Sequence, residues 1–227
     1  MAPFGKIYSY PNNPRVQRVQ ALAAMNGLEV ETVADFQMGV TNQTPEFLAK
    51  FPLGKVPAFE SADGTFFLTE SQAIARYVAE SGPRADELLG RDPRERALIE
   101  QWACFAEQEL VGNMLPAVLM CVAKFWPFDQ AAYDRSLSVL ERAVKRVDVA
   151  LQGGAPGKKF LVGDRLTFAD VMVVGALHIA AKYVVDADMR KEAPAVEPYV
   201  RAVLEVPEMK QYFGELELCE TRVGKPE

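Results

Sequence analysis

The sequence has few of the residues that build metal and redox sites. Among its 227 residues are one histidine, His178, and three cysteines, Cys104, Cys121 and Cys219. His178 lies in an apolar segment without a second histidine or a carboxylate at ligand spacing, so we interpret it as a core or pocket-wall residue. The cysteines are odd in number and too far apart for a CxxC pair, which argues against a zinc or redox site. We expect reduced, buried thiols, no metal and a cytoplasmic protein.

The sequence also lacks a basic block and a long apolar run. It carries 25 Lys and Arg against 31 Asp and Glu, and the resulting net charge of -6 does not suit binding to a nucleic-acid backbone. The most apolar run begins at Val171, includes His178 and Lys182, and falls short of the ~20 apolar residues that a membrane span needs. The opening MAPFGKIYSY shows no apolar secretory region. We therefore expect neither nucleic acid nor a membrane as a direct partner.

The first third of the chain alternates strand-like and helix-like periods. The strand-like runs KIYSY and LEVETVAD flank a helical segment from Arg15 to Asn26, and a right-handed crossover of this kind makes the two strands parallel. Thr44 and Pro45 are an N-cap and a first-turn residue that predict a short helix, TPEFLAK. The hairpin of VPAFE and TFFLTE, joined by SADG, and the helix SQAIARYVAE complete the order β-α-β-α-β-β-α. This is the order of a thioredoxin-like domain.

The composition changes near Ser81, where the chain turns from mixed to helical signals. The polar stretch SGPRADELLG contains turn formers and predicts a linker over residues 82–91. We assign residues 1–81 to the thioredoxin-like domain, 92–219 to an all-helical domain and 220–227 to a tail.

Helix starts are the clearest local signals of the second domain. Asp92 opens a DPRE sequence with an N-cap, a first-turn proline and a glutamate that can reach back. Apolar residues at spacings of three and four give one face to a helix over residues 129–151. Thr167 and Asp170 form a predicted capping box, and the helix that follows is apolar on nearly all sides and should be the centre of the domain. A further helix is predicted near residues 198–206.

Three segments at these positions, GKVPAFE, LTESQAIARYV and FLVGDRLTFADVMVV, resemble those of glutathione transferases, over nearly the whole chain. Within that family, TNQTPEFLAKFPLGKVPAFE and GELELCE are similar to the glutathione transferase-like part of the gamma subunit of eukaryotic translation elongation factor 1. The resemblance implies an α/β thioredoxin-like N-terminal domain plus an all-α C-terminal helical bundle, the glutathione transferase fold. It also implies glutathione as co-substrate or ligand, and a homodimer.

The segment that contains Pro57 carries the backbone contact with glutathione in this resemblance. In the family, the residue before the proline pairs its N–H and C=O with the cysteinyl backbone of the tripeptide, like an added antiparallel strand, and here that residue is Val56. A cis bond between Val56 and Pro57 would turn these groups toward the ligand. Without the resemblance an ordinary trans proline is the better expectation, because only ~5–6% of X–Pro bonds are cis.

The two charged ends of glutathione have separate candidates. Glu70 and Ser71 lie where a strand passes into a helix, so the helix N-terminus can accept the γ-glutamyl carboxylate while Glu70 takes the ammonium. A plain N-cap is the alternative interpretation of Ser71. The resemblance implies that Lys55, and also Asn42 and Gln43, hold the other end of the tripeptide. For Asn42 and Gln43 a solvated loop is an equal alternative.

The donor to the glutathione thiol is the hardest residue to find. A thiol titrates near ~8.5, so the site must stabilise the thiolate. Compared without gaps, the tyrosine-type donor of the family falls on Ser9 and the serine-type donor on Asn13, while a one-residue slip brings in Tyr8, Tyr10 or Asn12. We take Asn13 as the catalytic candidate and Ser9 as its alternative. Asn13 precedes a proline, so its oxygen can cap the first helix while its NH2 donates to a thiolate; the competing interpretation is that it only caps.

The resemblance predicts conjugation of the glutathione thiolate to a small apolar electrophile. The alternative is a non-catalytic scaffold module of the elongation factor 1 gamma type, with elongation-factor subunits as partners. The absence of a lysine- and proline-rich linker before the final Glu227 leads us to expect a transferase. Several apolar residues at helical spacing could line a cleft for the electrophile, although we expect most of them to be core. These are Phe105, Met114, Leu115, Met120, Phe125, Trp126 and Phe128.

Overall fold

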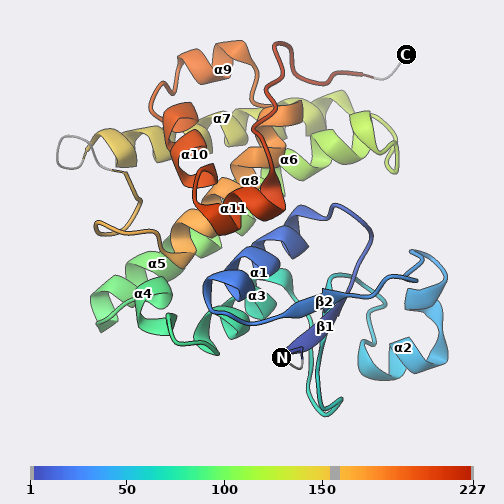
Figure 1. The fold of residues 1–227 in the computed structure, drawn as a ribbon. Helices are drawn as coiled ribbons and strands as arrows, with labels where there is room; N and C mark the ends of the chain where they lie inside the picture. The colour runs from blue at the N-terminus through green and yellow to red at the C-terminus, as the bar shows by residue number, and fades with distance from the viewer. Residues whose placement is uncertain (1–2, 154–158, 226–227) are drawn as a thin grey trace. The chain divides into compact units, whose positions relative to one another are not determined.

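The computed structural model describes residues 3–153 and 159–225 (Figure 1). It divides into an α/β unit that ends at Gly90 and a helical unit that begins at Arg91. Three short parts of the predicted segments lie outside the described residues, namely 1–2, 154–158 and 226–227.

The α/β unit contains a mixed four-stranded sheet in the order β2-β1-β3-β4. β1 and β2 are parallel, as the predicted crossover requires, and β3 pairs antiparallel with β1 and with β4. The strand order and directions are those of the predicted thioredoxin-like domain. The strands are β1 (Gly5–Tyr8), β2 (Val30–Thr32), β3 (Ala58–Ser61) and β4 (Phe67–Leu68).

The helices of this unit lie on both faces of the sheet. On one face Phe59 of β3 contacts Tyr77 of α3, with ring centroids 5.7 Å apart. On the other face Tyr8 of β1 contacts Phe47 of α2, with ring centroids 5.4 Å apart. Neighbouring strand residues therefore belong to different cores. The helices are α1 (Pro14–Met25), the 3-10 turn η1 (Thr41–Gln43), α2 (Pro45–Lys50), α3 (Ser71–Glu80) and α4 (Ala85–Leu89).

The stretch that the sequence analysis treats as a linker, 82–91, contains the helix α4. Buried Asn26 at the end of α1 holds this region. Its side-chain nitrogen donates to the Ala79 carbonyl at 2.9 Å, and its oxygen accepts from the Arg84 N–H at 3.0 Å. Because both bonds join segments distant in sequence, nothing in the local pattern indicates them.

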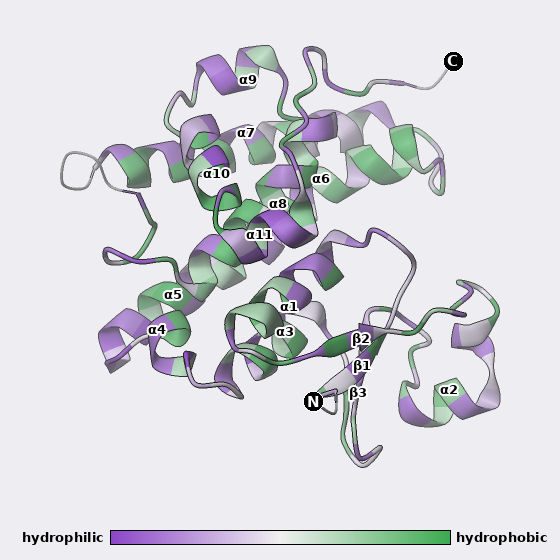
Figure 2. Cartoon of the chain, viewed as in Figure 1, coloured by the Kyte–Doolittle hydropathy of each residue, from purple (hydrophilic) through white to green (hydrophobic). Residues whose placement is uncertain are grey.

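The helical unit is built around α8 (Phe168–Tyr183), as the sequence predicts. Most residues of α8 are buried, including consecutive ones, so the helix is enclosed on nearly all sides. Figure 2 shows hydrophobic and hydrophilic residues alternating along α7, whose predicted apolar face is buried. In the part of the chain that the structure describes, no helix is long and apolar enough to cross a membrane. The other elements are α5 (Pro93–Phe105), the π-helical turns η2 (Ala106–Val111) and η3 (Val118–Val122), α6 (Gly112–Ala117), α7 (Gln130–Gln152), α9 (Ala187–Lys191), α10 (Val196–Leu204) and α11 (Pro207–Phe213).

The chain after α11 runs over the helical unit without regular structure. The Val223 N–H donates to the carbonyl of Tyr183, the last residue of α8, at 2.8 Å. Arg222 bonds Asp186 and Glu141, each through a contact of 3.1 Å. The described part of the predicted tail is therefore attached to the helices by backbone bonds and ion pairs.

Candidate functional site

The strand pairing brings the predicted site residues to one end of the sheet. β1 and β3 pair up to Tyr8 opposite Ala58, and β3 and β4 pair at Phe59 opposite Leu68. In antiparallel strands, the residues after Tyr8 and Leu68 lie beside those before Ala58. The residues gathered in this way are Ser9, Val56, Pro57, Glu70 and Ser71.

Val56 has the geometry that binding of an extended peptide requires. The Val56–Pro57 bond is cis, as the resemblance implies. The Val56 side chain packs against the cluster that contains Phe47 and Phe51. Within the described residues, the backbone N–H and C=O of Val56 make no hydrogen bond. An added strand could pair with both groups.

Glu70, and not Ser71, occupies the N-cap position of α3. Glu70 has φ 65° and ψ 110°, an uncommon left-handed conformation for a residue with a side chain, and it makes no side-chain cap bond. Ser71 is the first residue of the helix, so its interpretation as a plain N-cap is wrong. The first amides of a helix have no partner within it, which suits them to bind an anion.

The three residues expected at the other end of the tripeptide differ in exposure. Lys55 and Gln43 are exposed. Asn42 is only 2% exposed, so its interpretation as part of a solvated loop is wrong. Its amide oxygen accepts from the Gly39 N–H at 2.6 Å, and its amide nitrogen donates to the Gly54 carbonyl at 2.6 Å. Asn42 therefore bonds to the protein's own backbone, and direct contact with glutathione stays a prediction that these bonds do not favour.

Ser9 and Asn13 form a buried hydrogen-bonded pair. The Asn13 side-chain oxygen accepts from the Arg15 N–H at 3.0 Å, which confirms the predicted N-cap of α1. Its amide nitrogen donates to the Ser9 hydroxyl oxygen at 2.9 Å. Each of the two residues is 2% exposed. The two donor candidates are thus one unit, in which the Ser9 hydroxyl oxygen is an acceptor and its proton can still be donated.

The Tyr8 side chain lies on the face of the sheet that packs against α2. Its hydroxyl donates to a Glu60 carboxylate oxygen at 2.7 Å. Burial, the bond to Glu60 and the charge of Glu60 raise the pKa of Tyr8 to about 12. This hydroxyl is therefore committed to the protein interior. Of the other slip candidates, Tyr10 and Asn12 are exposed, and Asn12 has φ 57°.

Glu60 anchors α2 to the sheet through charged groups. This carboxylate is 5% exposed and lies 2.8 Å from Lys50 and 3.5 Å from Lys6. Burial alone would raise the pKa of Glu60, but the bonds from Lys50 and Tyr8 and the charges of both lysines lower it below the ordinary value. This cluster was not predicted from the sequence, although a glutamate in the apolar run VPAFE is a signal of a nearby cation.

Glu60→Gln is expected to reduce the loss of stability of the α/β unit in acid. The lowered pKa means that ionised Glu60 stabilises the fold above its ordinary pKa of 4.5, and that this stabilisation disappears as the pH falls through the lower, folded-state value. Thermal unfolding followed by circular dichroism between about pH 7 and pH 3 measures the effect. Glu46→Gln, an exposed change on α2, is the control and should retain the wild-type pH dependence. Equal pH dependence of Glu60→Gln and wild type would contradict the prediction.

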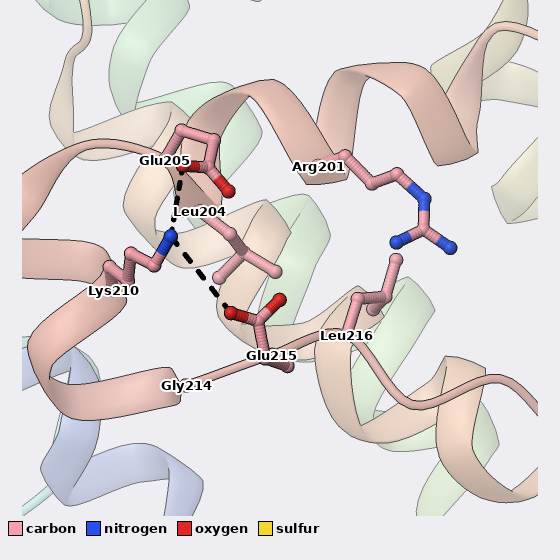
Figure 3. A pocket seen from close by; sticks show the side chains of 7 residues that line it. All are labelled: Arg201, Leu204, Glu205, Lys210, Gly214, Glu215 and Leu216. Carbon is pink, nitrogen blue, oxygen red and sulfur yellow. Dashed lines mark hydrogen bonds and ion pairs between the residues drawn. The ribbon is translucent and has the colours of Figure 1, made fainter.

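A hollow of about 70 Å³ in the helical unit contains no predicted site residue (Figure 3). Lys210 lies between Glu205 and Glu215, at 3.0 and 3.9 Å, and Arg201 contacts Glu197 at 2.8 Å. Because these charges compensate one another, the hollow offers no unpaired charge to an anionic tripeptide.

Fewer of the apolar residues that could line a cleft for the electrophile are buried than the sequence predicts. Met114 and Met120 are buried, whereas Phe125 is 79% and Trp126 is 51% exposed. The expectation that most of the seven are core is therefore wrong. The remaining three are half-buried, namely Phe105, Leu115 and Phe128.

His178 and the cysteines lie in ordinary, partly buried protein environments. His178 is half-buried, its Nε2 lies 3.1 Å from the Glu215 carbonyl oxygen, and burial lowers its pKa. Among the described residues, no group of three or more His, Cys, Asp or Glu side chains could hold a metal. The cysteines are free as expected, but they are half-buried and not fully buried.

Comparison with known proteins identifies one family. Residues 3–80 match the glutathione S-transferase N-terminal domain, and residues 105–207 match the glutathione S-transferase C-terminal domain. The chain is 44% identical over 222 residues to the glutathione S-transferase-like protein LUC7 of a Fusarium species, with 98% of each protein covered. It is 35% identical over 219 residues to elongation factor 1-gamma of Mus musculus, with 95% of this chain and 48% of that protein covered.

Two solved structures share the fold. The glutathione transferase-like domain of elongation factor 1-gamma from Saccharomyces cerevisiae matches with a TM-score of 0.80 at 20% identity, over 100% of both chains. The glutathione transferase URE2P6 from Phanerochaete chrysosporium, solved in complex with oxidised glutathione, matches with a TM-score of 0.80 at 22% identity, over 93% of this chain and 95% of that one. With the two domain matches and the Fusarium relative, these findings show that the chain belongs to the glutathione S-transferase family.

Proposed function

We propose that the protein binds glutathione at the end of its sheet and conjugates the thiolate to a small apolar electrophile. The observation that carries this proposal is the Val56 backbone, whose N–H and C=O make no bond to the described residues beside the cis bond to Pro57. The cysteinyl backbone of glutathione would pair with these groups. The α3 N-terminus would bind the γ-glutamyl carboxylate, Glu70 its ammonium, and Lys55 the glycyl end.

The proposed chemistry needs only a stabilised thiolate and a positioned electrophile. The thiol gives its proton to solvent, a sulfur electron pair forms a bond to the electrophilic carbon, and the bond to the leaving group breaks with its electron pair. The Ser9 hydroxyl would donate to the thiolate while it accepts from Asn13. A chain of hydrogen bonds polarises its members, so Asn13 would strengthen the Ser9 donor. The positive end of α1 would favour the thiolate further.

A homodimer in the cytoplasm is part of this proposal. Met38, Val40 and Leu53 are 58, 61 and 70% exposed. They lie on two loops of the α/β unit that Asn42 joins through bonds to Gly39 and Gly54. Exposed apolar side chains on adjoining loops are suited to burial in an interface.

Leu53→Asp is expected to shift the protein from dimer to monomer, because a charge would be buried in the proposed interface without a partner. Size-exclusion chromatography with light scattering measures the change. The control is Val149→Asp, at an apolar residue of α7 that is 62% exposed. A wild-type monomer, or a dimer unaffected by Leu53→Asp, would contradict this assignment.

A scaffold module of a translation complex is the second candidate function. It is supported by the relation to elongation factor 1-gamma, whose length the chain spans by about half. The exposed aromatic pair Phe125 and Trp126 favours it as well, since such residues are enriched at protein interfaces. The partners would be elongation-factor subunits.

One preparation of the whole chain can test both candidates. Isothermal titration calorimetry measures glutathione binding, and a spectrophotometric assay with a generic aryl halide measures conjugation. Binding together with conjugation above the solution rate is expected. Binding without conjugation would exclude the enzyme, and recovery of a nucleotide-exchange subunit in a pull-down would then support the scaffold. Absence of binding would overturn the glutathione site itself.

A further inference from the structure

We infer that Asn42 is a positioning residue of the proposed glutathione site, which fixes the backbone leading into Val56 and does not touch the ligand. The inference rests on the proposed function for the identity of the ligand. Its structural basis is the pair of 2.6 Å bonds that Asn42 makes to Gly39 and Gly54.

The environment of Asn42 gives these bonds a large effect. Asn42 is in the turn η1, between half-buried Thr41 and exposed Gln43, and its side chain points inward, so that the residue is 2% exposed. Hydrogen bonds shielded from water are stronger, and a buried backbone group left without its partner is costly. The Gly54 carbonyl would lose its side-chain donor if the amide were removed.

Gly54 links the Asn42 side chain to the backbone that leads into Val56. Its N–H donates to the Phe51 carbonyl at the end of α2, at 2.9 Å, and its C=O accepts from Asn42. The residue has φ +60°, and a Cβ atom there would lie 3.0 Å from the Asn42 carbonyl oxygen. Both sides of Gly54 are therefore fixed, and its C=O belongs to the same planar peptide group as the Lys55 N–H.

The orientation of that peptide group sets the direction of the chain toward Val56. If it rotates, the Val56 N–H and C=O turn away from the line on which an added strand would pair. The Asn42 side chain itself has one bond from its oxygen and one from its nitrogen, both to the protein backbone.

A ligand truncation separates positioning from direct contact. Asn42→Ala is expected to weaken glutathione binding roughly tenfold, the effect of losing about one buried hydrogen bond. Affinity for γ-glutamylcysteine, which lacks the glycyl end, should fall by the same factor, because the Val56 backbone would pair with both ligands. The turnover number at saturating glutathione should not change. Glu46→Gln, at an exposed residue of α2 outside the predicted site, is the control and should leave both affinities unchanged.

A second readout needs no ligand. Hydrogen exchange of the Gly39 N–H, which bonds the Asn42 side chain, and of the Gly54 N–H, which bonds the Phe51 carbonyl, should be faster in Asn42→Ala than in wild type or Glu46→Gln. Asn42→Asp, which keeps the size and places an oxygen against the Gly54 carbonyl, should act like Asn42→Ala and serves if the alanine variant does not fold.

The outcomes that overturn the inference are distinct. A loss confined to glutathione, with γ-glutamylcysteine unaffected, would mean direct contact with the glycyl end. A lower melting temperature with unchanged affinities would mean a structural role only. Wild-type protein that binds neither ligand would overturn the proposed function, and unchanged hydrogen exchange would refute the positioning of the loop independently.

Discussion

Asp170→Ala is expected to lower the free energy of unfolding of the helical unit by about 4 kcal/mol, which would be a large share of the stability of an ordinary domain. Asp170 has no exposed surface and receives four hydrogen bonds of 2.9 to 3.0 Å. The donors are the Leu161 N–H, the Thr167 N–H and hydroxyl, and the Tyr199 hydroxyl. Burial raises the pKa of Asp170, while all four donors oppose the rise.

Alanine removes every acceptor at once and leaves buried donors without partners, which costs more than the bonds contribute net. The Asp170 carboxylate also joins the loop before α8 to the start of α8 and to α10, so its loss affects three segments. Urea unfolding followed by tryptophan fluorescence reports on this unit, because both tryptophans, Trp102 and Trp126, belong to it.

Two variants define the scale of this effect. Tyr199→Phe removes one of the four donors and should cost about 1 kcal/mol. Asp164→Ala, an exposed aspartate in the same loop region, should be nearly neutral. If Asp170→Ala lowered the free energy of unfolding by less than about 1 kcal/mol, the capping box would contribute little to stability and the prediction would be wrong.

Local chemistry made most of the fold predictable. The N-caps at Asn13, Thr44, Asp92 and Thr167 were all expected, because a cap depends on residues within one turn of each other. The burial of α8 followed from its uniformly apolar sequence. The helix α4 was missed because SGPRADELLG combines turn formers with helix formers, and Asn26, whose bonds hold this region, is distant in sequence.

The site was less predictable because its decisive contacts are not local. The role of Val56 and its cis bond came from the family resemblance, and without it the rarity of cis X–Pro bonds would have favoured a trans proline. The inward orientation of Asn42 depends on Gly54, which is twelve residues away. The bond between Tyr8 of β1 and Glu60 of β3 depends on both side chains lying on the same face of the sheet, and a one-residue change in register would separate them.

Ser9→Ala is expected to lower the conjugation rate about 100-fold, the usual cost of removing one donor from a developing or resting anion in a shielded site. Because the lost hydrogen bond favours the thiolate, the pKa of bound glutathione should rise toward the ordinary thiol value near ~8.5. The loss should then be greatest at neutral pH and smaller in alkaline solution. Glutathione affinity should change little, since the Val56 backbone would still bind the peptide.

Asn13→Ala separates the two members of the pair. If Ser9 is the donor and Asn13 polarises it, Asn13→Ala should give a smaller rate loss than Ser9→Ala and an additional loss of about 1 kcal/mol in stability from the missing cap of α1. If Asn13 is itself the donor, its variant loses activity while Ser9→Ala does not. Tyr8→Phe is the control, because the Tyr8 hydroxyl is bonded to Glu60 on the face of the sheet that packs against α2.

A double variant tests whether Ser9 and Asn13 act on the thiolate as one unit. Ser9 and Asn13 share one hydrogen bond, so their effects on the rate should be far from additive, and the double variant should be little worse than Ser9→Ala. The pH profile of conjugation and an ultraviolet titration of the bound thiolate would report the same shifted pKa if the pair acts on sulfur. Additive losses without a change in that pKa would assign both residues to the support of α1 and transfer the search for the donor to exposed Tyr10 and Asn12.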